Sequence, residues 1–89
     1  MLETEYIILT YDSKTQLDMS AIFALEDIIV RLQSQNIKLL LVITREDVYK
    51  NITIMETIIN QIGKNSLFDN EKDAIDAAIL GLKEQGENL

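Results

Sequence analysis

The chain has 89 residues, of which 47% are apolar, so it can form one domain with a modest core and is too apolar to be disordered. It contains neither cysteine nor histidine, which excludes disulfides, thiolate nucleophiles, imidazole bases and metal sites built from these residues. Its formal net charge of −7 disfavours nucleic acid as a partner, and it lacks the run of about 18 apolar residues that a membrane-spanning helix needs.

The first half of the chain predicts two buried strands joined by a helix. Tyr6–Leu9 is apolar at every position, which is typical of a parallel strand covered on both faces. After a polar loop, apolar residues recur at three- and four-residue spacings and predict an amphipathic helix. This helix starts near Asp18 or Ser20 and ends near Asn36, a residue that tolerates the left-handed stop. Lys38–Ile43 follows as a second apolar strand.

The middle of the chain predicts less regular helical structure. Thr44–Asp47 reads as a turn and a helix start. Val48–Ile54 contains several poor helix formers, so Met55–Ile62 either continues the same helix or forms a second one. Gly63–Asn65 then breaks the helical pattern.

The last part predicts a short third strand, Ser66–Phe68, and a final helix capped by Asp69 or Asn70. The helix ends at Gly86, and residues 86–89 fit either native chain or the remnant of a tag or linker. The resulting β-α-β-α-β-α order predicts one domain over residues 1–89, with a mainly parallel sheet. The expected inner face of the final helix consists of Ala74, Ile75, Ala78, Ile79 and Leu82.

No catalytic arrangement is evident. Asp69, Glu71, Asp73 and Asp76 gather at the start of the final helix, where carboxylates complement the helix dipole. Their spacing is not that of a calcium loop, so a solvated helix start is favoured over a metal site. Gly63 stands alone, and no glycine-rich phosphate loop exists. We therefore expect no metal and no cofactor.

One turn is a candidate functional site, because it joins the first buried strand to the first predicted helix. Helix amides at such a turn can hold an anion, and a kinase can modify the Ser20 hydroxyl. The alternative is that Asp18 or Ser20 only caps the helix. The turn consists of Leu17, Asp18, Met19 and Ser20.

Four segments resemble, in order, the STAS domain, the family of bacterial anti-sigma factor antagonists and of the cytoplasmic tails of sulfate permease (SulP) anion transporters. The resemblance covers Tyr6 to Leu82 and implies a STAS fold and a non-enzymatic role. The complete fold has two further strands and a helix before the strand at Tyr6, so it also implies a partial domain without them. The segments are Leu17–Glu26, Gln35–Val42, Ile62–Phe68 and Asp73–Ala78.

The turn also separates the subfamilies. Anti-sigma factor antagonists typically carry Asp-Ser-Ser-Gly-Leu there and are phosphorylated on the first residue after the Asp. In this chain that residue is Met19, which has no hydroxyl, and the usual Gly is Ala21. Phosphorylation at the family position is therefore excluded, and Ser20 lies one place away. Ala24–Glu26 and Lys38–Val42 look more like permease tails.

The resemblance implies a regulatory module of a SulP-type sulfate or other anion transporter, which binds proteins through the turn at the cytoplasmic side of the cell membrane. Implied partners are the transporter's membrane domain, another STAS copy or a cytosolic protein, without insertion into the membrane. Three strands would leave an open edge and an uncovered apolar face, so we expect a homo-oligomer that is soluble on its own. The alternatives are a stand-alone anti-sigma factor antagonist, a stressosome-like protein, and a fragment of a doubly wound enzyme.

Overall fold

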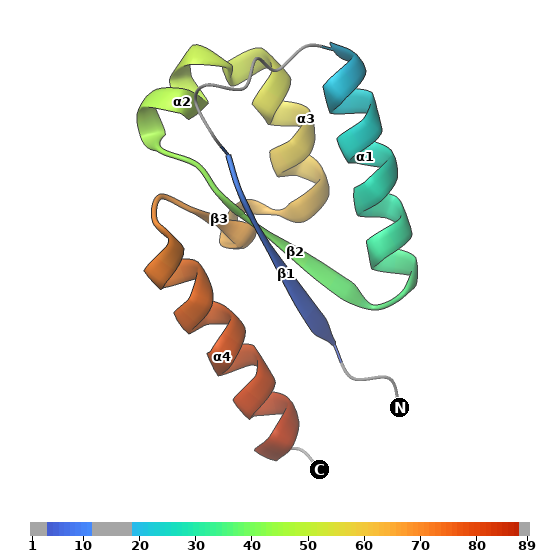
Figure 1. Ribbon diagram of the computed structural model, residues 1–89, viewed down its shortest axis with the longest axis vertical. Coiled ribbons are helices and arrows are strands. Elements are labelled where there is room, and N and C mark those ends of the chain that lie inside the picture. Colours follow the sequence, from blue (N-terminus) through green and yellow to red (C-terminus); the bar gives the residue numbers. More distant parts are fainter. Residues whose placement is uncertain (1–3, 12–18, 88–89) are drawn as a thin grey trace.

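Three parallel strands form one sheet in the part of the chain that the structure describes (Figure 1). The computed structural model describes residues 4–11 and 19–87. The sheet order is β1 (Glu5–Thr10), β2 (Ile37–Val42), β3 (Leu67–Phe68). β1 pairs with β2 along its whole length, whereas β3 pairs only with the last two residues of β2. The predicted parallel sheet is confirmed, and its strands begin and end within about a residue of the predicted bounds.

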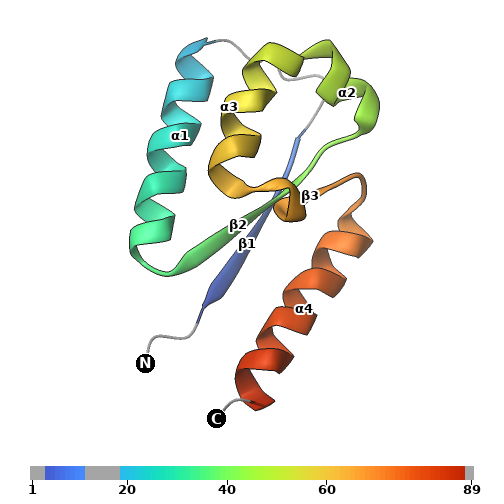
Figure 2. The same ribbon diagram turned by 180° about the vertical axis from the view of Figure 1, so that it is seen from behind.

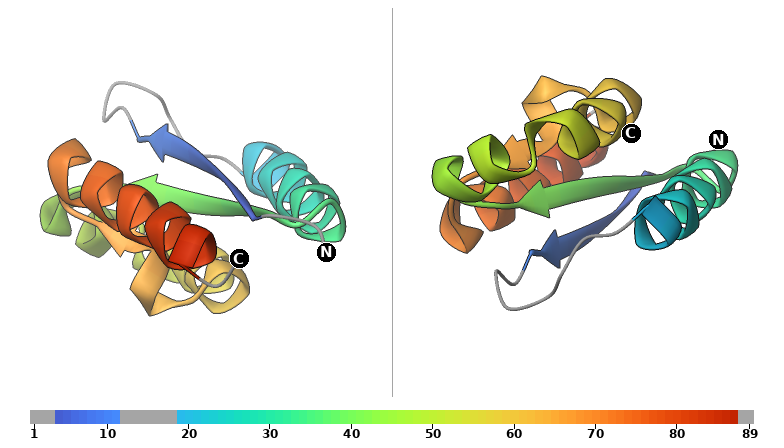
Figure 3. Two further views of the ribbon diagram at one scale, coloured as in Figure 1. Left: turned by 90° about the horizontal axis from the view of Figure 1, so that it is seen from below. Right: turned by 90° about the horizontal axis from the view of Figure 1, so that it is seen from above.

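Helices cover both faces of this sheet. Within the described residues they are α1 (Met19–Ser34), α2 (Arg45–Lys50), α3 (Ile52–Ile62) and α4 (Glu71–Glu87), with a short 3₁₀ turn η1 (Lys64–Ser66) before β3. Figures 1 and 2 show α4 on one side of the sheet and α1 and α3 on the other. Seen from its ends in Figure 3, the sheet has β1 at its outer edge.

α1 forms and ends as the sequence predicts. Ile22 and Ile29 lie two turns apart on its inner face and are almost fully buried. Asn36 adopts a φ of 60°, the left-handed conformation that asparagine tolerates better than other side chains. Just before it, the Gln35 N–H donates to the Leu32 carbonyl at 3.0 Å. The chain thereby reverses directly into β2.

α2 and α3 are separate helices, so the second of the two predicted alternatives is confirmed. Thr44 caps α2, because its hydroxyl accepts a hydrogen bond from the Asp47 N–H at 3.2 Å. Asn51 separates the helices with φ −123° and ψ 29°, and its side-chain amide donates to the Asp47 carbonyl at 2.9 Å. The break lies at Asn51, the first of the weak helix formers, where a local side-chain hydrogen bond competes with the helix. The second helix therefore begins at Ile52, three residues before the expected Met55.

The main core lies between the sheet and the helices α1 and α3. Alternate residues of β2 contribute Leu39 and Leu41 to it, followed by Ile43, and α3 adds Met55 and Ile58. Leu40 and Val42 are equally buried, but strand alternation turns them toward α4 on the other face. The continuous apolar run of β2 is thus explained by helices on both sides of the sheet.

The start of α4 is capped as predicted. The Asn70 carboxamide oxygen accepts a hydrogen bond from the Asp73 N–H at 2.8 Å, and its nitrogen donates to the Asp73 carboxylate at 2.9 Å. The break before β3 is also confirmed, because Gly63 adopts a φ of 85°.

The predicted inner face of α4 is only partly correct. Ala74 and Ala78 are buried, whereas the larger side chains assigned to the same face are exposed. The small residues let α4 approach the sheet closely, so a narrow alanine and glycine row makes the contact and the large side chains remain at its flank. Gly86 does not end the helix, which continues to Glu87. The exposed residues are Ile75, Ile79 and Leu82.

Gly81 continues this narrow row against β1. A methyl group added at Gly81 would overlap the hydroxyl oxygen and ring of Tyr6. We expect Gly81→Ala to lower the free energy of unfolding by about 1 kcal/mol in urea denaturation, because overpacking costs about 1–3 kcal/mol against a helix-propensity gain of about 1 kcal/mol. The cost should shrink in a Tyr6→Phe background, where the hydroxyl is gone. An equal cost in both backgrounds, or none, would contradict this packing.

The two ends of the described chain meet at one end of the sheet. The Thr4 N–H donates to the Gln85 carboxamide oxygen at 2.6 Å, and the Gln85 nitrogen donates to the Thr4 carbonyl at 3.1 Å. These two hydrogen bonds join residues that lie 81 positions apart in the sequence. They fix the last turns of α4 beside the start of β1.

Candidate functional site

The described part of the predicted turn, Met19 and Ser20, lies at the end of the sheet where the parallel strands terminate. α1 begins there, close to the top of Figure 1 and away from the end that carries Thr4 and Gln85. Met19 and Ser20 are the first two residues of α1, and both are exposed. Leu17 and Asp18 lie outside the described residues. The structure therefore places half of the predicted turn, at the first turn of a helix.

Met19 belongs to a row of exposed apolar side chains, which we call the α1 outer stripe. It consists of Met19, Phe23 and Val30, whose spacing of four and seven residues puts them on one side of the helix. Met19 is 53% exposed and Phe23 is 61% exposed. Met19 and Phe23 lie one helical turn apart and offer adjoining apolar surface to another polypeptide. Val30 lies farther along the same side, beyond the charged residue Asp27.

Phe23 was not singled out from the sequence, although a signal was present. Ile22 and Ile29 define the inner face of α1, and a residue next to Ile22 is turned by about 100° from it. An aromatic residue at that position has to face solvent or a partner. Ser20 lies one such step beyond Met19 and is therefore on a different side of the helix from the stripe. Asp27 and Arg31 form an exposed ion pair of 3.1 Å along the same helix.

The described residues do not assemble a metal site. Among them, no group of three or more acidic, histidine or cysteine side chains could hold an ion. Of the acidic residues at the start of α4, Asp69 accepts a hydrogen bond from Asn70 at 2.9 Å, and Asp73 takes part in the helix cap. These contacts explain two of the acidic residues there as parts of the helix start.

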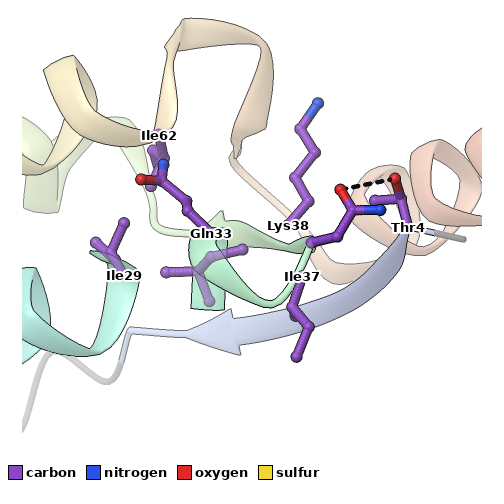
Figure 4. Close-up of a pocket in the computed structure, with 8 residues that line it drawn as sticks. Thr4, Ile29, Gln33, Ile37, Lys38 and Ile62 are labelled. Carbon is purple, nitrogen blue, oxygen red and sulfur yellow. Dashed lines mark hydrogen bonds between the residues drawn. The ribbon is translucent and has the colours of Figure 1, made fainter. Parts of the chain in front are cut away.

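Two open pockets occur away from the turn. One, of about 300 Å³, lies near the start of β2 and is lined by side chains such as Ile29, Gln33 and Ile62 (Figure 4). At its rim the Thr4 hydroxyl donates to the Asn36 carboxamide oxygen at 3.4 Å, and the Lys38 side chain extends outward. Neither the Thr4–Asn36 hydrogen bond nor the outward Lys38 side chain places a nucleophile or an acid–base pair inside this pocket.

The second pocket, of about 810 Å³, lies beside α2, the start of α3, β3 and the start of α4. Its charged lining is mixed, with Arg45 and Lys64 against Asp69 and Asp73. Such a balance does not select one class of charged ligand. The exposed stripe of α1 thus remains the most distinctive surface near the predicted turn.

A family model of the STAS domain matches residues 2–74. The chain belongs to the STAS family. The match extends from the start of the chain through β1, the turn at Met19, α1 and the strands to the first turn of α4. The three-stranded α/β arrangement of the described residues is consistent with a truncated STAS fold. No curated protein and no solved structure matches this chain.

STAS domains are typically non-enzymatic interaction modules, which suits a site made of exposed apolar side chains. In the part of the chain that the structure describes, no helix has the length and apolar character required to cross a bilayer. Met19, the first described residue of the predicted turn, presents its thioether side chain in an exposed position at the start of α1.

Proposed function

We propose that this STAS domain is a non-enzymatic regulatory module of a SulP-type anion transporter, and that it acts by protein contacts on the cytoplasmic side of the membrane. The observation that carries the proposal is the α1 outer stripe at the family's functional turn. Met19 and Phe23 offer apolar area to a partner where a phosphorylated relative would offer a hydroxyl. The partner is the membrane domain of the transporter, another STAS copy or a cytosolic protein.

The chemistry of Met19 favours constant contact over a phosphorylation switch. A methionine side chain is flexible and polarizable, so it adapts to an irregular apolar surface. It accepts no phosphate, and hence a partner bound at the stripe is not displaced by phosphorylation at that position. The turn's contact set comprises Leu17, Asp18, Met19 and Ser20, with Phe23 and Val30 extending it along α1.

Binding to a membrane domain gives the direct test. The probe is the detergent-purified membrane domain of a SulP transporter encoded in the same genome. We expect Phe23→Glu to weaken binding at least about tenfold, since central aromatic side chains often contribute 2 kcal/mol or more to an interface. Tyr49→Glu changes an even more exposed aromatic residue on α2 and should leave the affinity unchanged.

Equal loss in both variants, or in neither, would contradict a contact through the stripe. The genomic reading frame around this sequence provides a second test of the transporter assignment. Membrane helices encoded in the same frame, or in an adjacent gene that co-purifies, would support it. A frame without them, next to a gene for an anti-sigma factor, would favour the alternative of a stand-alone antagonist or a stressosome-like protein.

The alternative makes a different prediction with a switch kinase that phosphorylates antagonists of this family. We expect the unaltered chain to take up no phosphate, because Met19 lacks a hydroxyl, and Met19→Ser to gain one phosphate by mass spectrometry. Met19→Ala is the matched control and should stay unmodified. Phosphate on Ser20 of the unaltered chain would contradict the proposal and restore a signalling switch.

A further inference from the structure

Among the residues that the structure describes, one backbone edge of β1 pairs with no other strand. On its inner side the Glu5 N–H donates to the Asn36 carbonyl at 3.2 Å, and the Tyr11 N–H donates to the Val42 carbonyl at 2.8 Å. Backbone groups alternate along a strand, so the residues between them that point away from β2 are Tyr6, Ile8 and Thr10. No described strand lies beyond β1 (Figure 3).

The Gln85 side chain occupies the backbone groups of Thr4, which lies two residues before Tyr6 on the same edge. Its carboxamide accepts from the Thr4 N–H at 2.6 Å and donates to the Thr4 carbonyl at 3.1 Å. A carboxamide carries the same donor and acceptor as a peptide group, so it bonds Thr4 as a neighbouring strand would. A strand that adds to β1 can therefore form backbone hydrogen bonds with three residues, Tyr6, Ile8 and Thr10. The backbone groups of Thr4, the next residue on this edge before Tyr6, are already bonded to Gln85.

Apolar side chains flank this open edge on both faces of the sheet. Ile7 and Leu9 are 42% and 40% exposed on the face that carries α1. On the other face, the Thr10 hydroxyl donates to the Glu71 carboxylate at 3.2 Å. Because Glu71 lies near Thr10, the row of α4 side chains that begins with Glu71 faces the unpaired edge of β1. That row has the spacing i, i+4, i+8, i+11 and continues from Glu71 through the exposed Ile75, Ile79 and Leu82.

The edge also lacks the features that usually prevent strands from pairing. No charged residue, proline or glycine occurs from Tyr6 to Thr10, although these are the residues that normally protect edges. With a net charge of −7, two copies repel each other over most of their surface. A neutral strand is the place where they can approach.

We propose that β1 pairs with β1 of a second copy, antiparallel, about a two-fold axis through Ile8. Tyr6 then faces Thr10 of the partner subunit and Ile8 faces its own equivalent, so all three open residues form hydrogen-bonded pairs. Ile7 lies opposite Leu9 of the partner subunit in both halves. The partner is a second copy because the open edge is self-complementary in this register, as an isologous interface requires.

Gln85 selects this register over its neighbours. An axis through Ile7 would place Thr10 opposite Thr4, whose backbone groups Gln85 already occupies. An axis through Leu9 would carry Tyr6 beyond the end of β1. A six-residue strand alone is smaller than a standard interface of roughly 800 Å² per partner, and the apolar rows on the two faces supply the additional area.

This dimer specifies one of the partners in the proposed function, a second copy that binds through β1. It rests on the proposed function only for its role in the cell. Light scattering coupled to size-exclusion chromatography tests it at micromolar concentration. We expect a dimer of the 10.2 kDa chain, and a shift to monomer with at least tenfold weaker association for Leu9→Lys. Tyr49→Lys, which alters an exposed aromatic residue on α2, should remain dimeric, and circular dichroism should show that both variants stay folded.

Cysteine pairs test the register, because the chain has no cysteine of its own. An equal mixture of Ile7→Cys and Leu9→Cys should form disulfide-linked dimers under mild oxidation, since directly opposite Cα atoms lie about 4.5–5.5 Å apart. Each variant alone should crosslink much less. A monomeric chain, a Leu9→Lys variant that stays dimeric, or efficient crosslinking of one variant alone would overturn the inference. Leu9→Lys should still bind the transporter membrane domain, so failure of dimerisation and failure of the proposed function give separate results.

Discussion

Replacing Ile58 by alanine should lower the free energy of unfolding by about 3 kcal/mol, the largest effect that we expect from a conservative change. Ile58 lies on α3 with no exposed surface and contacts the core formed with Leu39 and Leu41. Removing its outer carbons loses buried apolar area and leaves a cavity, which typically costs 2–5 kcal/mol. A domain of this size has a total stability of only about 5–10 kcal/mol, so the variant should unfold at a clearly lower urea concentration.

Ile52→Ala is the matched control for this change. Ile52 lies on the same helix, one and a half turns earlier, but its side chain is exposed. We expect it to cost less than about 1 kcal/mol, as surface substitutions usually do. If the two variants had equal midpoints in urea, the assignment of the inner face of α3 would be wrong.

Ala74→Asp should have a comparable or larger effect, because it places a carboxylate between α4 and the sheet. Ala74 has no exposed surface, and an unpaired buried charge costs several kcal/mol. We expect a loss of at least about 3 kcal/mol, with faster hydrogen exchange in α4 and β3 than in α1. The weaker protection follows from the detachment of α4, whose contacts hold β3 from that face.

Ile79→Asp separates this packing from the one predicted from the sequence, which put Ile79 on the inner face. The same charged residue is introduced in the same helix, but Ile79 is exposed. Measured in a Leu9→Lys background, which removes the contribution of dimerisation, it should cost less than about 1 kcal/mol. A loss as large as that of Ala74→Asp would mean that the flank of α4, and not its alanine row, contacts the sheet.

Local signals were sufficient for most of the fold. The apolar run at Lys38–Ile43 has no polar alternation, as in a strand covered on both faces, and β2 is covered in that way. The same expectation is wrong for Tyr6–Leu9, because β1 lies at the edge of the sheet and leaves Ile7 and Leu9 exposed. Asn70 and Asn36 act as predicted, as a cap and as a left-handed stop, and Thr44 caps the helix that was predicted to start within Thr44–Asp47. Each acts within a few residues of its own position. These features depend on interactions between residues that are close together in the sequence, so a sequence pattern is sufficient to predict them.

Most of the errors came from features that depend on tertiary distance. The choice of inner face on α4 followed the largest side chains, whereas the close approach of α4 to β1 at Gly81 makes the smallest ones face the sheet. A different error is local: the break at Asn51 depends on a hydrogen bond to the Asp47 carbonyl, four residues earlier, which a propensity scale does not contain. The edge closure by Gln85 joins positions 81 residues apart, a relation that no local pattern encodes.

The candidate site was predictable only in part. The strand-to-helix turn at Met19 follows from the pattern, and its family follows from the ordered resemblance, which the match to residues 2–74 confirms. Phe23 was not predicted to belong to the site, because a single exposed aromatic residue is common on protein surfaces. Its position beside Met19 and Val30 becomes visible only once α1 is described. The transporter assignment and the contact role of this turn stay predictions.

The pairing of Thr4 with Gln85 also governs how this domain can be joined to other chains. These residues join the start of β1 to the last turns of α4. Both elements reach one end of the molecule in Figure 1, and α1 begins at the opposite end. Polypeptide fused at either side would leave from one end, as in domains that tolerate insertion into a host protein. The domain can therefore be attached to a larger protein at one end, while the start of α1, with Met19 and Phe23, is exposed at the opposite end.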